Sequence, residues 1–585
     1  MNNHTKEIVS CLLVLILLLG TESSASNKCK HNNLSTVSLL QTQVGGELKI
    51  RLHKNFDRLE EEKYHPSNVF WDDAKSKNWP GDHEGRTILG LVRDAQATGR
   101  EPKYLKETID LIPNYLNAKG YMGKMHAKGI MDEQQLAGNG WFIRGLIEYY
   151  KWKKDEKVLQ YIKSNIDSLF IPGKGLYANY PIDPKLRSNR HGKASGSIYS
   201  TVNNWMLSTD IGCLFIGMDG AIHAYELLRE QPLKEIIDEM VERFLKTDII
   251  AIQAQTHATL TAMRGLMTYS ELTGNKQLIT EVEKRWELYK EYGMTENYAN
   301  YNWFKRYDAW TEPCAIVDAY FVASELWETT KNQSYLADLD LIYYNALAHA
   351  QRENGGFGCD IFQRPDTNNL VVRIPEAHWC CTMRGADGLS KVDENSNFTE
   401  KNSLYIVHYS DNNAKLKVDK NTSVSINQKS KYPFAGEVEM QIADITRPKS
   451  FTIYLNALQV FSENVSISVN GKNEKVYIEN GLYKLHRVWK KGDKIKFTFN
   501  LKTQVVSPQN KEKYSDNLRK VLIGPLLLGY SGTPNISLPS KIELNKIAPL
   551  IYKVKDTDIE LSPVYHLMDK NVIKGDTYKK QILFY

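Results

Sequence analysis

The sequence has little excess charge and only one long apolar run, and both shortages narrow what the protein can be. Lys and Arg number 75 against 69 Asp and Glu, a formal net charge of +6 over 585 residues. This is too weakly basic for a dedicated nucleic-acid-binding protein. With 42% hydrophobic and 25% charged residues, the composition is that of an ordinary globular protein and excludes wholesale disorder. The length allows several hydrophobic cores, so we expect at least two domains.

The one long apolar run lies near the N-terminus, between Ile8 and Gly20. It is shorter than the ~20 apolar residues that a helix needs to cross a bilayer, and small polar residues follow it up to Ala25. We interpret residues 1–25 as a signal peptide, with an uncleaved anchor as the alternative. The mature protein is then expected to be periplasmic or secreted, with no stable membrane span.

Cysteine is scarce, and the sequence contains no Cys-x-x-Cys pair. Six cysteines lie outside the signal segment, and disulfides are the ordinary expectation for them in an exported protein. A chain of this size does not need disulfides for stability, and adjacent cysteines such as Cys380 and Cys381 rarely bridge to each other. The pairing of Cys29, Cys213 and Cys359 stays open at this stage.

Between about Arg86 and Ala350 the sequence repeats one pattern: an apolar-periodic helix, a short break, a Leu and a second helix. The five breaks begin at Ala97, Trp152, Leu228, Leu272 and Thr329. Apolar spacing near 3.6 with few β-branched runs indicates stacked helical hairpins. Because the breaks are irregularly spaced and rich in aromatic and polar residues, we expect a closed (α/α) barrel whose loops form a pocket, in preference to an open solenoid.

After about Asn402 the sequence changes to short alternating segments rich in Val, Ile, Tyr and Thr, separated by turn signals such as Asn470-Gly471. We therefore predict a multidomain α and β fold, with a helical barrel over residues 26–400 and an appended β-sandwich region over 401–585. A strand-like stretch near Val37 to Leu52 precedes the first helices and is expected to pack on the sandwich.

The strongest candidate site combines Glu312 and Cys314 with a second segment that carries His378, Cys380 and Cys381. Three thiolates and one carboxylate suffice for a tetrahedral Zn²⁺ site, and a bound metal would keep adjacent cysteines from oxidising after export. His378 is an alternative ligand. The residues also leave open a buried Cys314 beside a partly disulfide-bonded pair.

Further candidates lie in the loops between the expected helices. Asp82, His83 and Glu84 stand at a helix start, where acidic residues also act as ordinary caps. Glu296 lies in an aromatic stretch between helices, where partial burial would favour the protonated form that a general acid needs. A solvated loop carboxylate is the alternative for Glu296.

Aromatic and histidine side chains add to the expected pocket. Trp310 belongs to a group of loop tryptophans, and aromatic faces commonly stack on sugar rings, although several members of the group are expected in the core. His257 begins a helix and can point into the pocket, although a single His is more often structural.

Taken together, these residues resemble the β-L-arabinofuranosidase family of glycoside hydrolases, family 127 and its relatives. The shared features are the Glu-x-Cys at Glu312, the Cys380-Cys381 pair, Glu296 sixteen residues before the Glu-x-Cys, and His257 ahead of a Glu-Leu-Thr-Gly break. Strand-like segments such as VSISVNGK and IGPLLLGY also look like the family's β-sandwich. The likeness covers most of the mature chain.

The resemblance implies an (α/α)₆ barrel and a Zn²⁺ ion held by Glu312, Cys314, Cys380 and Cys381. It also implies a retaining mechanism in which Cys380 is the nucleophile and Glu296 is first the general acid and then the base. This chemistry has a physical basis, because zinc keeps a thiol deprotonated and a thiolate is a strong nucleophile. The acid and the thiolate replace the two carboxylates of ordinary sugar hydrolysis.

Two departures from the family pattern border the expected sugar pocket. Asn139 stands where family members carry a His, and a Thr-Met-Arg sequence follows Cys381 where they run into Pro-Pro-Asn. The sugar can therefore differ while the catalytic pair is kept. The side chains expected to bind substrate are Asp82, His83, Glu84, Asn139, His257, Trp310 and His378.

The sequence thus predicts an exported, zinc-dependent, retaining exo-glycoside hydrolase that releases β-L-arabinofuranose or a similar terminal sugar from an oligosaccharide or polysaccharide. One alternative is a non-catalytic glycan-binding protein with a structural zinc. Another is a uronate-processing hydrolase or lyase, because Arg86, Arg306 and Arg384 offer groups that recognise carboxylates. The oligomeric state stays open.

Overall fold

The computed structural model describes residues 34–70, 78–187, 196–362, 368–475, 477–510, 512, 514, 517–569 and 578–585. All of them belong to one compact unit, Leu34–Tyr585. The predicted signal segment 1–25 and Cys29 lie outside the described residues. Within the described ranges, no helix is long and apolar enough to pass through a membrane.

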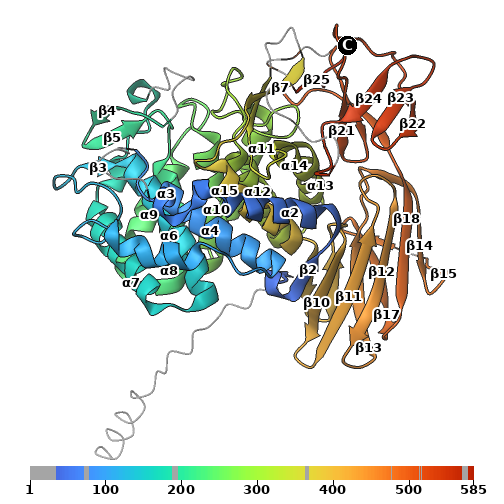
Figure 1. Cartoon of the computed structure of the whole chain (residues 1–585), viewed down its shortest axis with the longest axis horizontal. Coiled ribbons are helices and arrows are strands. Elements are labelled where there is room, and N and C mark those ends of the chain that lie inside the picture. The colour runs from blue at the N-terminus through green and yellow to red at the C-terminus, as the bar shows by residue number, and fades with distance from the viewer. Residues whose placement is uncertain are drawn as a thin grey trace, which may run out of the picture. The chain divides into compact units, whose positions relative to one another are not determined.

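Six helices pack side by side in a closed ring, in the order α4, α6, α8, α10, α12, α15 and back to α4 (Figure 1). Their bounds are α4 (Asp82–Thr98), α6 (Glu133–Lys153), α8 (Leu214–Leu228), α10 (Thr256–Thr273), α12 (Pro313–Thr330) and α15 (Cys381–Glu394). These helices are buried on most sides, including polar residues such as Thr261 and Arg264 of α10. Because buried polar groups need partners, the charged side chains of the ring must pair with one another inside it.

A second layer of helices covers the ring. It consists of α2 (Gly46–Leu59) against α4 and α15, α5 (Leu105–Leu111) against α4, α7 (Glu156–Asn165) against α6, α9 (Gln231–Leu245) against α8, α11 (Gln277–Tyr292) against α10, and α13 (Ser334–Ile342) against α12. These helices are amphipathic: in α9, Leu233, Ile236, Ile237 and Met240 are buried at helical spacing. The predicted (α/α)₆ barrel is confirmed.

Two mostly antiparallel sheets form a sandwich beside the barrel. Their strand orders are β1-β8-β9-β13-β17-β16 and β15-β14-β18-β12-β11-β10-β2. The bounds are β1 (Ser35–Thr36), β2 (Thr42–Val44), β8 (Asn397–Glu400), β9 (Ser403–Ile406), β10 (Asn412–Asp419), β11 (Thr422–Ser430), β12 (Glu437–Ile445), β13 (Lys449–Asn456), β14 (Ser462–Val469), β15 (Lys472–Asn473), β16 (Tyr477–Glu479), β17 (Leu482–Trp489) and β18 (Lys494–Leu501). Residues of β10 and β11 are buried alternately, and the rings of Tyr483 and Phe497, one from each sheet, lie 5.8 Å apart. The predicted β-sandwich is confirmed.

The stretch expected to be a strand near residues 37–52 is a strand only in part. Strands β1 and β2 pair with β8 and β10, so this segment does pack on the sandwich. From Gly46 onward the chain is helix α2, and the prediction of a strand there is wrong. Buried Leu48, Leu52, Phe56 and Leu59 recur every three to four residues, which is the helical period and not the alternation of a strand.

A third sheet, with the order β19-β20-β21-β24-β23-β22, follows the sandwich. Its strands are β19 (Thr503–Val506), β20 (Lys520–Ile523), β21 (Leu526–Gly529), β22 (Leu544–Ala548), β23 (Ile551–Val554) and β24 (Glu560–Pro563). The last strand, β25 (Lys579–Gln581), pairs with β7 (Asn369–Ile374), which pairs with β6 (Cys359–Phe362). The C-terminal chain therefore returns to the segment that leads into Cys380.

Five short elements, three strands and two helices, complete the barrel side. Strands β3 (Met131–Asp132), β4 (Ile198–Val202) and β5 (Trp205–Ser208) form a small sheet, and α3 (Pro66–Val69) and α14 (Ala348–Ala350) are short helices. Strand β5 ends just before the loop that connects to α8. This loop carries one of the cavity residues described below.

Candidate active site

A cavity of about 310 Å³ lies at the N-terminal ends of the inner helices. The N-cap residues of four of them line it: Gly81 before α4, Gln255 before α10, Glu312 before α12 and Cys380 before α15. Helix N-termini carry partial positive charge, so they favour anionic groups at this end of the ring. The aromatic side chains of the lining are Trp79, Tyr115, Trp310 and Trp379.

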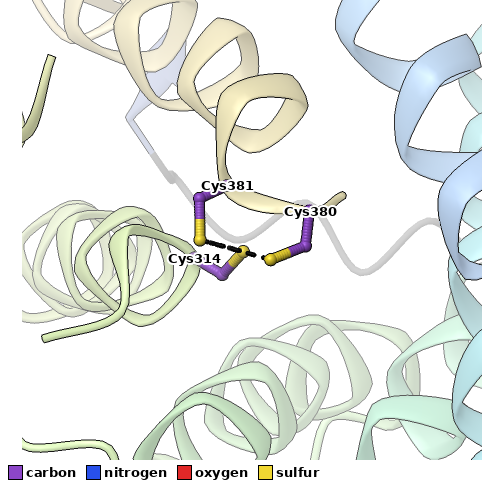
Figure 2. A group of neighbouring side chains, drawn as sticks. All are labelled: Cys314, Cys380 and Cys381. Atoms are coloured by element: carbon purple, nitrogen blue, oxygen red, sulfur yellow. Dashed lines mark hydrogen bonds between the residues drawn. The ribbon is translucent and has the colours of Figure 1, made fainter. Parts of the chain in front are cut away.

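Three thiols meet at this cavity (Figure 2). The Sγ atom of Cys381 lies 3.6 Å from that of Cys314 and 3.3 Å from that of Cys380, and all three sulfur atoms lie within 4.8 Å of one another. All three are free thiols, as are Cys213 and Cys359. Clustered thiolates are preferred ligands of Zn²⁺, so the chemistry of this donor set fits a thiophilic metal ion.

A buried guanidinium stabilises negative charge on the cluster. Arg86 donates to Cys314 Sγ at 3.1 Å, and its other nitrogens bind both oxygens of Asp82 at 2.9 and 2.7 Å. Burial acts to raise the pKa of Cys314, but its hydrogen bonds with Cys380 and Cys381 and the charge of Arg86 outweigh burial and hold the pKa well below its usual value. The pKa values of Cys380 and Cys381 are raised, by the bond to Cys314 and by burial respectively. The surroundings of Cys314 thus favour its thiolate form.

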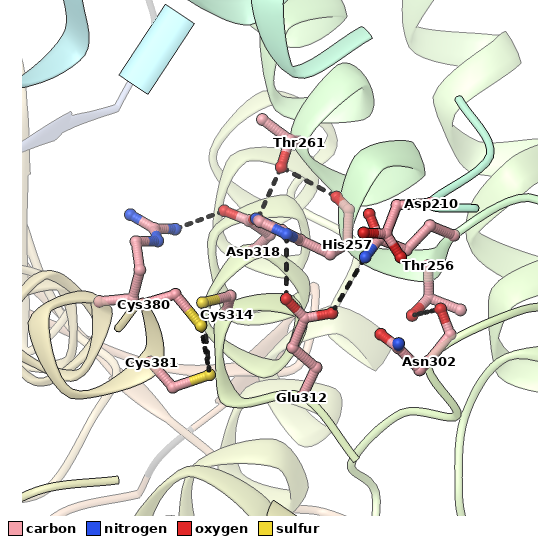
Figure 3. Close-up of polar contacts among 12 residues, drawn as sticks. Asp210, Thr256, His257, Thr261, Asn302, Glu312, Cys314, Asp318, Cys380 and Cys381 are labelled. Carbon is pink, nitrogen blue, oxygen red and sulfur yellow. Dashed lines mark hydrogen bonds and ion pairs between the residues drawn. The ribbon is translucent and has the colours of Figure 1, made fainter. Parts of the chain in front are cut away.

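Glu312, the fourth predicted ligand, lines the cavity but faces a histidine (Figure 3). Its Oε1 lies 3.2 Å from His257 Nδ1, and its Oε2 accepts a bond of 3.5 Å from Gln255 Nε2. His257 Nε2 in turn lies 3.3 Å from Asp318 Oδ2. Burial acts to lower the pKa of His257, but Glu312 and Asp318 outweigh it and raise the pKa to about 10. His257 is therefore a cation held between two carboxylates, and Glu312 is not part of the thiol group.

Asp318 pairs with two buried arginine side chains in addition to His257. Its Oδ1 lies 2.5 Å from a nitrogen of Arg264 and 2.5 Å from a nitrogen of Arg384. These arginines outweigh burial and lower the pKa of Asp318. The guanidinium groups of Arg86 and Arg384 each lie 4.4 Å from the ring centroid of Trp141, which links this network to the thiols.

Most of the predicted substrate-binding residues reach the cavity. Its lining includes the predicted side chains Asp82, His83, Glu84, His257 and Trp310. His83 Nδ1 lies 2.8 Å from the carbonyl of Val69, and burial lowers the pKa of His83 to about 4, so its ring is neutral. His378 is not in the lining; its ring lies edge-on to Trp379, with centroids 5.0 Å apart.

Asn139 is a structural residue, which corrects its prediction as a substrate ligand. Its Oδ1 accepts bonds from the amide of Met122 at 3.0 Å and from Asn165 Nδ2 at 2.7 Å. Its Nδ2 donates to the carbonyls of Gln135 at 2.9 Å and Met122 at 3.1 Å. Both ends of the amide are engaged, and the side chain is fully buried outside the cavity lining. Asn139 therefore fixes the wall residue Met122 and has no capacity left for a sugar.

Glu296 is fully buried but lies away from the cavity lining. Its Oε2 lies 3.0 Å from Lys520 Nζ, and its two oxygens accept bonds of 3.0 Å from the backbone amides of Gln509 and Asn510. Glu296 and Tyr298 raise the pKa of Lys520 against the effect of burial, so Lys520 is charged. Glu296 is not among the residues that line the cavity, and its assignment as the acid stays a prediction. A carboxylate among aromatic side chains needs a counter-ion, and here the third sheet supplies it.

Asp210 is a cavity carboxyl that the sequence analysis missed. It is 3% exposed, and its Oδ2 accepts a bond of 2.7 Å from the amide of Gly196. Its Oδ1 has no hydrogen-bond partner among the described residues. Burial, and then the charge of Glu312, raise the pKa of Asp210 to about 8, so its carboxyl group is protonated at neutral pH. The available signal was its position in a loop before a predicted inner helix.

Comparisons with known proteins agree with this architecture. Residues 403–501, which form most of the sandwich, match the family model described as beta-L-arabinofuranosidase, GH127 middle domain. The chain has the fold of the GH127 enzymes. The GH127 beta-arabinofuranosidase BT3674 superposes with a TM-score of 0.70 at 14% identity, over 95% of this chain and 98% of that one. Ara127N-Se, a GH127 beta-L-arabinofuranosidase from Geobacillus stearothermophilus T6, superposes with a TM-score of 0.68 at 13% identity, over 93% and 99%.

A third structure, described as a glycoside hydrolase, has a TM-score of 0.69 at 14% identity and covers 96% of this chain and 98% of its own. A comparison with curated protein sequences finds no match. The resemblance inferred from the sequence is thus confirmed for the fold over nearly the whole chain.

The contacts of Glu296 predict a stability effect. Replacing Lys520 by Met leaves a buried carboxylate without its counter-ion, so we expect the free energy of unfolding in urea at pH 7 to fall by about 3–5 kcal/mol. Glu296→Gln leaves Lys520 unpaired and is expected to have a similar cost. The double variant, which removes both charges, should lose less than the sum of the two. A Lys520→Met protein within about 1 kcal/mol of the wild type would contradict this placement.

Proposed function

We propose that the protein is a zinc-dependent, retaining glycoside hydrolase that removes a terminal neutral sugar, β-L-arabinofuranose or a similar pentose, from an oligosaccharide or polysaccharide. The observation that carries the proposal is the group of three free thiols at the cavity of the barrel. The exo mode and the sugar come from the resemblance, and two of the structures with this fold are described as beta-arabinofuranosidases.

Cys380 is the best-placed nucleophile of the three thiols. It lines the cavity and is only partly buried, whereas Cys314 and Cys381 are 0% and 1% exposed. A thiolate attacks an anomeric carbon directly, and the covalent intermediate splits the displacement into two steps, which preserves the configuration of the sugar. We assign Cys380 to this attack.

The thiols of Cys314, Cys380 and Cys381 would hold the Zn²⁺ ion. The resemblance assigns Glu312 as the fourth ligand, and in this structure that carboxylate pairs with His257. When bound, the ion keeps the thiols deprotonated at neutral pH. The chain itself contributes the Arg86 guanidinium, which stabilises the Cys314 thiolate, and Asp82, which holds Arg86 in place.

The walls of the cavity suit an uncharged, hydroxyl-bearing ring. Trp79, Trp310 and Trp379 offer aromatic faces for the apolar side of a sugar. Gln255 and Asn302 line the same cavity, and their buried side-chain oxygens, Oε1 and Oδ1, have no hydrogen-bond partner among the described residues. Unpaired buried acceptors of this kind are satisfied when sugar hydroxyl groups donate to them.

The alternative of a uronate-processing enzyme loses its support, because the three arginines that suggested it are paired within the chain. Arg86 binds Asp82, Arg384 binds Asp318 and Asp387, and Arg306 binds Asp308. Those carboxylates occupy the guanidinium N–H groups that a substrate carboxylate would need. We keep the non-catalytic glycan-binding protein as the competing function, and the activity experiment below separates the two.

Export remains part of the proposal. The apolar segment between Ile8 and Gly20 supports a cleaved signal peptide and a periplasmic or secreted enzyme. The thiol cluster is compatible with an oxidising compartment, since a bound metal protects thiols from oxidation.

The metal site predicts the metal content of the purified protein. We expect about one zinc ion per chain by inductively coupled plasma mass spectrometry, and a loss of most of that zinc in Cys314→Ser, because a hydroxyl is a poor replacement for a thiolate ligand. Cys213→Ser is the matched control, since Cys213 is equally buried but packs beside Trp141 in a separate apolar cluster. Equal zinc content in the two variants would show that the thiol cluster does not bind the metal.

The nucleophile assignment predicts a loss of turnover. With 4-nitrophenyl β-L-arabinofuranoside as substrate, kcat/KM of Cys380→Ser should fall by a factor of about 10³ or more, while its melting temperature stays close to that of the wild type. Wild-type protein that binds arabinose-containing oligosaccharides but releases no sugar would support the glycan-binding alternative instead. Near-wild-type turnover by Cys380→Ser would show that Cys380 is not the nucleophile.

A further inference from the structure

We propose that Trp379 is the platform on which the leaving group of the substrate stacks, and that this leaving group begins with a second sugar ring. The inference rests on the proposed glycosidase function and names the substrate class: a terminal sugar linked to another sugar, and not to an aliphatic or a peptide group. Polar and aromatic side chains lie at different depths of the cavity, and this difference is the starting observation.

The floor of the cavity, meaning the lining residues that are more than nine-tenths buried, is mostly polar. Its polar side chains include Asp82, His83, Arg86, Gln255, His257 and Asn302. A buried surface with many hydrogen-bonding groups suits the hydroxyl groups of the terminal sugar. The rest of the glycan then has to extend toward solvent, past the lining residues that are more exposed.

The rim of the cavity, meaning the lining residues that are partly or fully exposed, is mostly apolar and aromatic. Its apolar side chains within the described residues are Trp79, Pro80, Tyr115, Trp310, Ile374 and Trp379. The leaving group of a substrate whose terminal sugar occupies the floor lies against this rim. An aromatic side chain and the C–H face of a sugar ring both lose water when they stack.

Three of the four aromatic rim residues already have a ring against another part of the protein. Trp310 meets Trp303 edge to face with ring centroids 5.5 Å apart, and Tyr115 stacks on Phe70 with centroids 4.3 Å apart. Trp79 packs against a buried apolar cluster. These contacts hold the three rings as parts of the wall, so the fourth aromatic residue of the rim is the one best placed to meet the leaving group.

Trp379, the fourth, is exposed and yet fixed in place. It is 41% exposed, and its ring contact within the described residues is a T-shaped one with His378, at 5.0 Å between centroids. A T-shaped contact covers at most one face of the indole. The amide of Cys380 donates to the carbonyl of Ala377 at 3.4 Å, and buried Tyr64 donates to the carbonyl of His378 at 3.0 Å, so the turn that carries Trp379 is held at both ends. A preordered aromatic face loses little conformational entropy when a ligand stacks on it.

The charge of the rim favours an uncharged leaving group. Apart from the Cys380 thiol, the described rim contains one side chain that carries charge near neutral pH, Glu312, and that carboxylate is paired with His257. A charged peptide therefore meets no free counter-ion there. A neutral sugar ring presents C–H groups to the indole and hydroxyl groups to water, which matches an aromatic face that is half open to solvent.

The test compares methyl β-L-arabinofuranoside with the three disaccharides in which β-L-arabinofuranose is linked to O2, O3 or O5 of methyl L-arabinofuranoside. All of these leaving groups depart as alkoxides, so the ratio of kcat/KM for the best disaccharide to that for the methyl glycoside reports contacts with the second ring. In Trp379→Ala we expect this ratio to fall by a factor of about 5–10, and in Trp379→Phe to recover most of its wild-type value. Tyr477→Ala, which removes an exposed aromatic side chain on β16, is the control and should keep the wild-type ratio.

Isothermal titration calorimetry with Cys380→Ser provides a readout without turnover. Adding Trp379→Ala to this variant should weaken disaccharide binding by a factor of about 5–10. A wild-type ratio in Trp379→Ala together with unchanged disaccharide binding would overturn the assignment. A loss confined to phenyl β-L-arabinofuranoside would assign the platform to an aromatic leaving group and overturn the choice of a sugar. Wild-type protein that hydrolyses none of these glycosides, but binds the disaccharides through Trp379, would contradict the proposed function and support the platform. The absence of both hydrolysis and binding would overturn both.

Discussion

The pairing of Asp318 with Arg264, Arg384 and His257 is the interaction on which the site depends. These side chains come from three inner helices, α10, α12 and α15, and they meet where the ring is closed to water. A buried carboxylate without its partners would cost several kcal/mol, so the helices must keep their register around it. The same register carries Glu312 and the thiols into the cavity, because the N-caps of α10, α12 and α15 all lie at its wall.

A series of contacts between charged side chains connects this pairing to the thiols. Asp318 keeps His257 protonated, His257 holds Glu312, and Arg384 shares the ring of Trp141 with Arg86, which donates to Cys314. The N-terminal ends of the inner helices add partial positive charge at the same place. The result is a buried region that stabilises anions, although the protein as a whole carries little net charge. Thiolate chemistry and metal binding both depend on such a region.

The sequence predicted what depends on local period and on residue type. The helical spacing of apolar residues predicted the barrel, and the alternation of apolar and polar residues predicted the sandwich. The metal-binding chemistry of Cys314, Cys380 and Cys381 predicted the thiol group. The sequence could not show which carboxylate faces the cavity. Glu296 stands at the spacing that the resemblance implies, but its counter-ion, Lys520, comes from a strand of the third sheet far along the chain. Asp210 stands in a loop with no recognisable motif, and only the closing of the ring brings it to Glu312.

The most direct test of the glycosidase assignment is mass spectrometry of the protein quenched at low pH during turnover of an activated β-L-arabinofuranoside. The assignment predicts a peptide that contains Cys380 and carries the mass of one pentosyl group, attached through sulfur. A pentosyl group on a carboxylate peptide would contradict it, as would product released with inverted configuration and no adduct on any peptide.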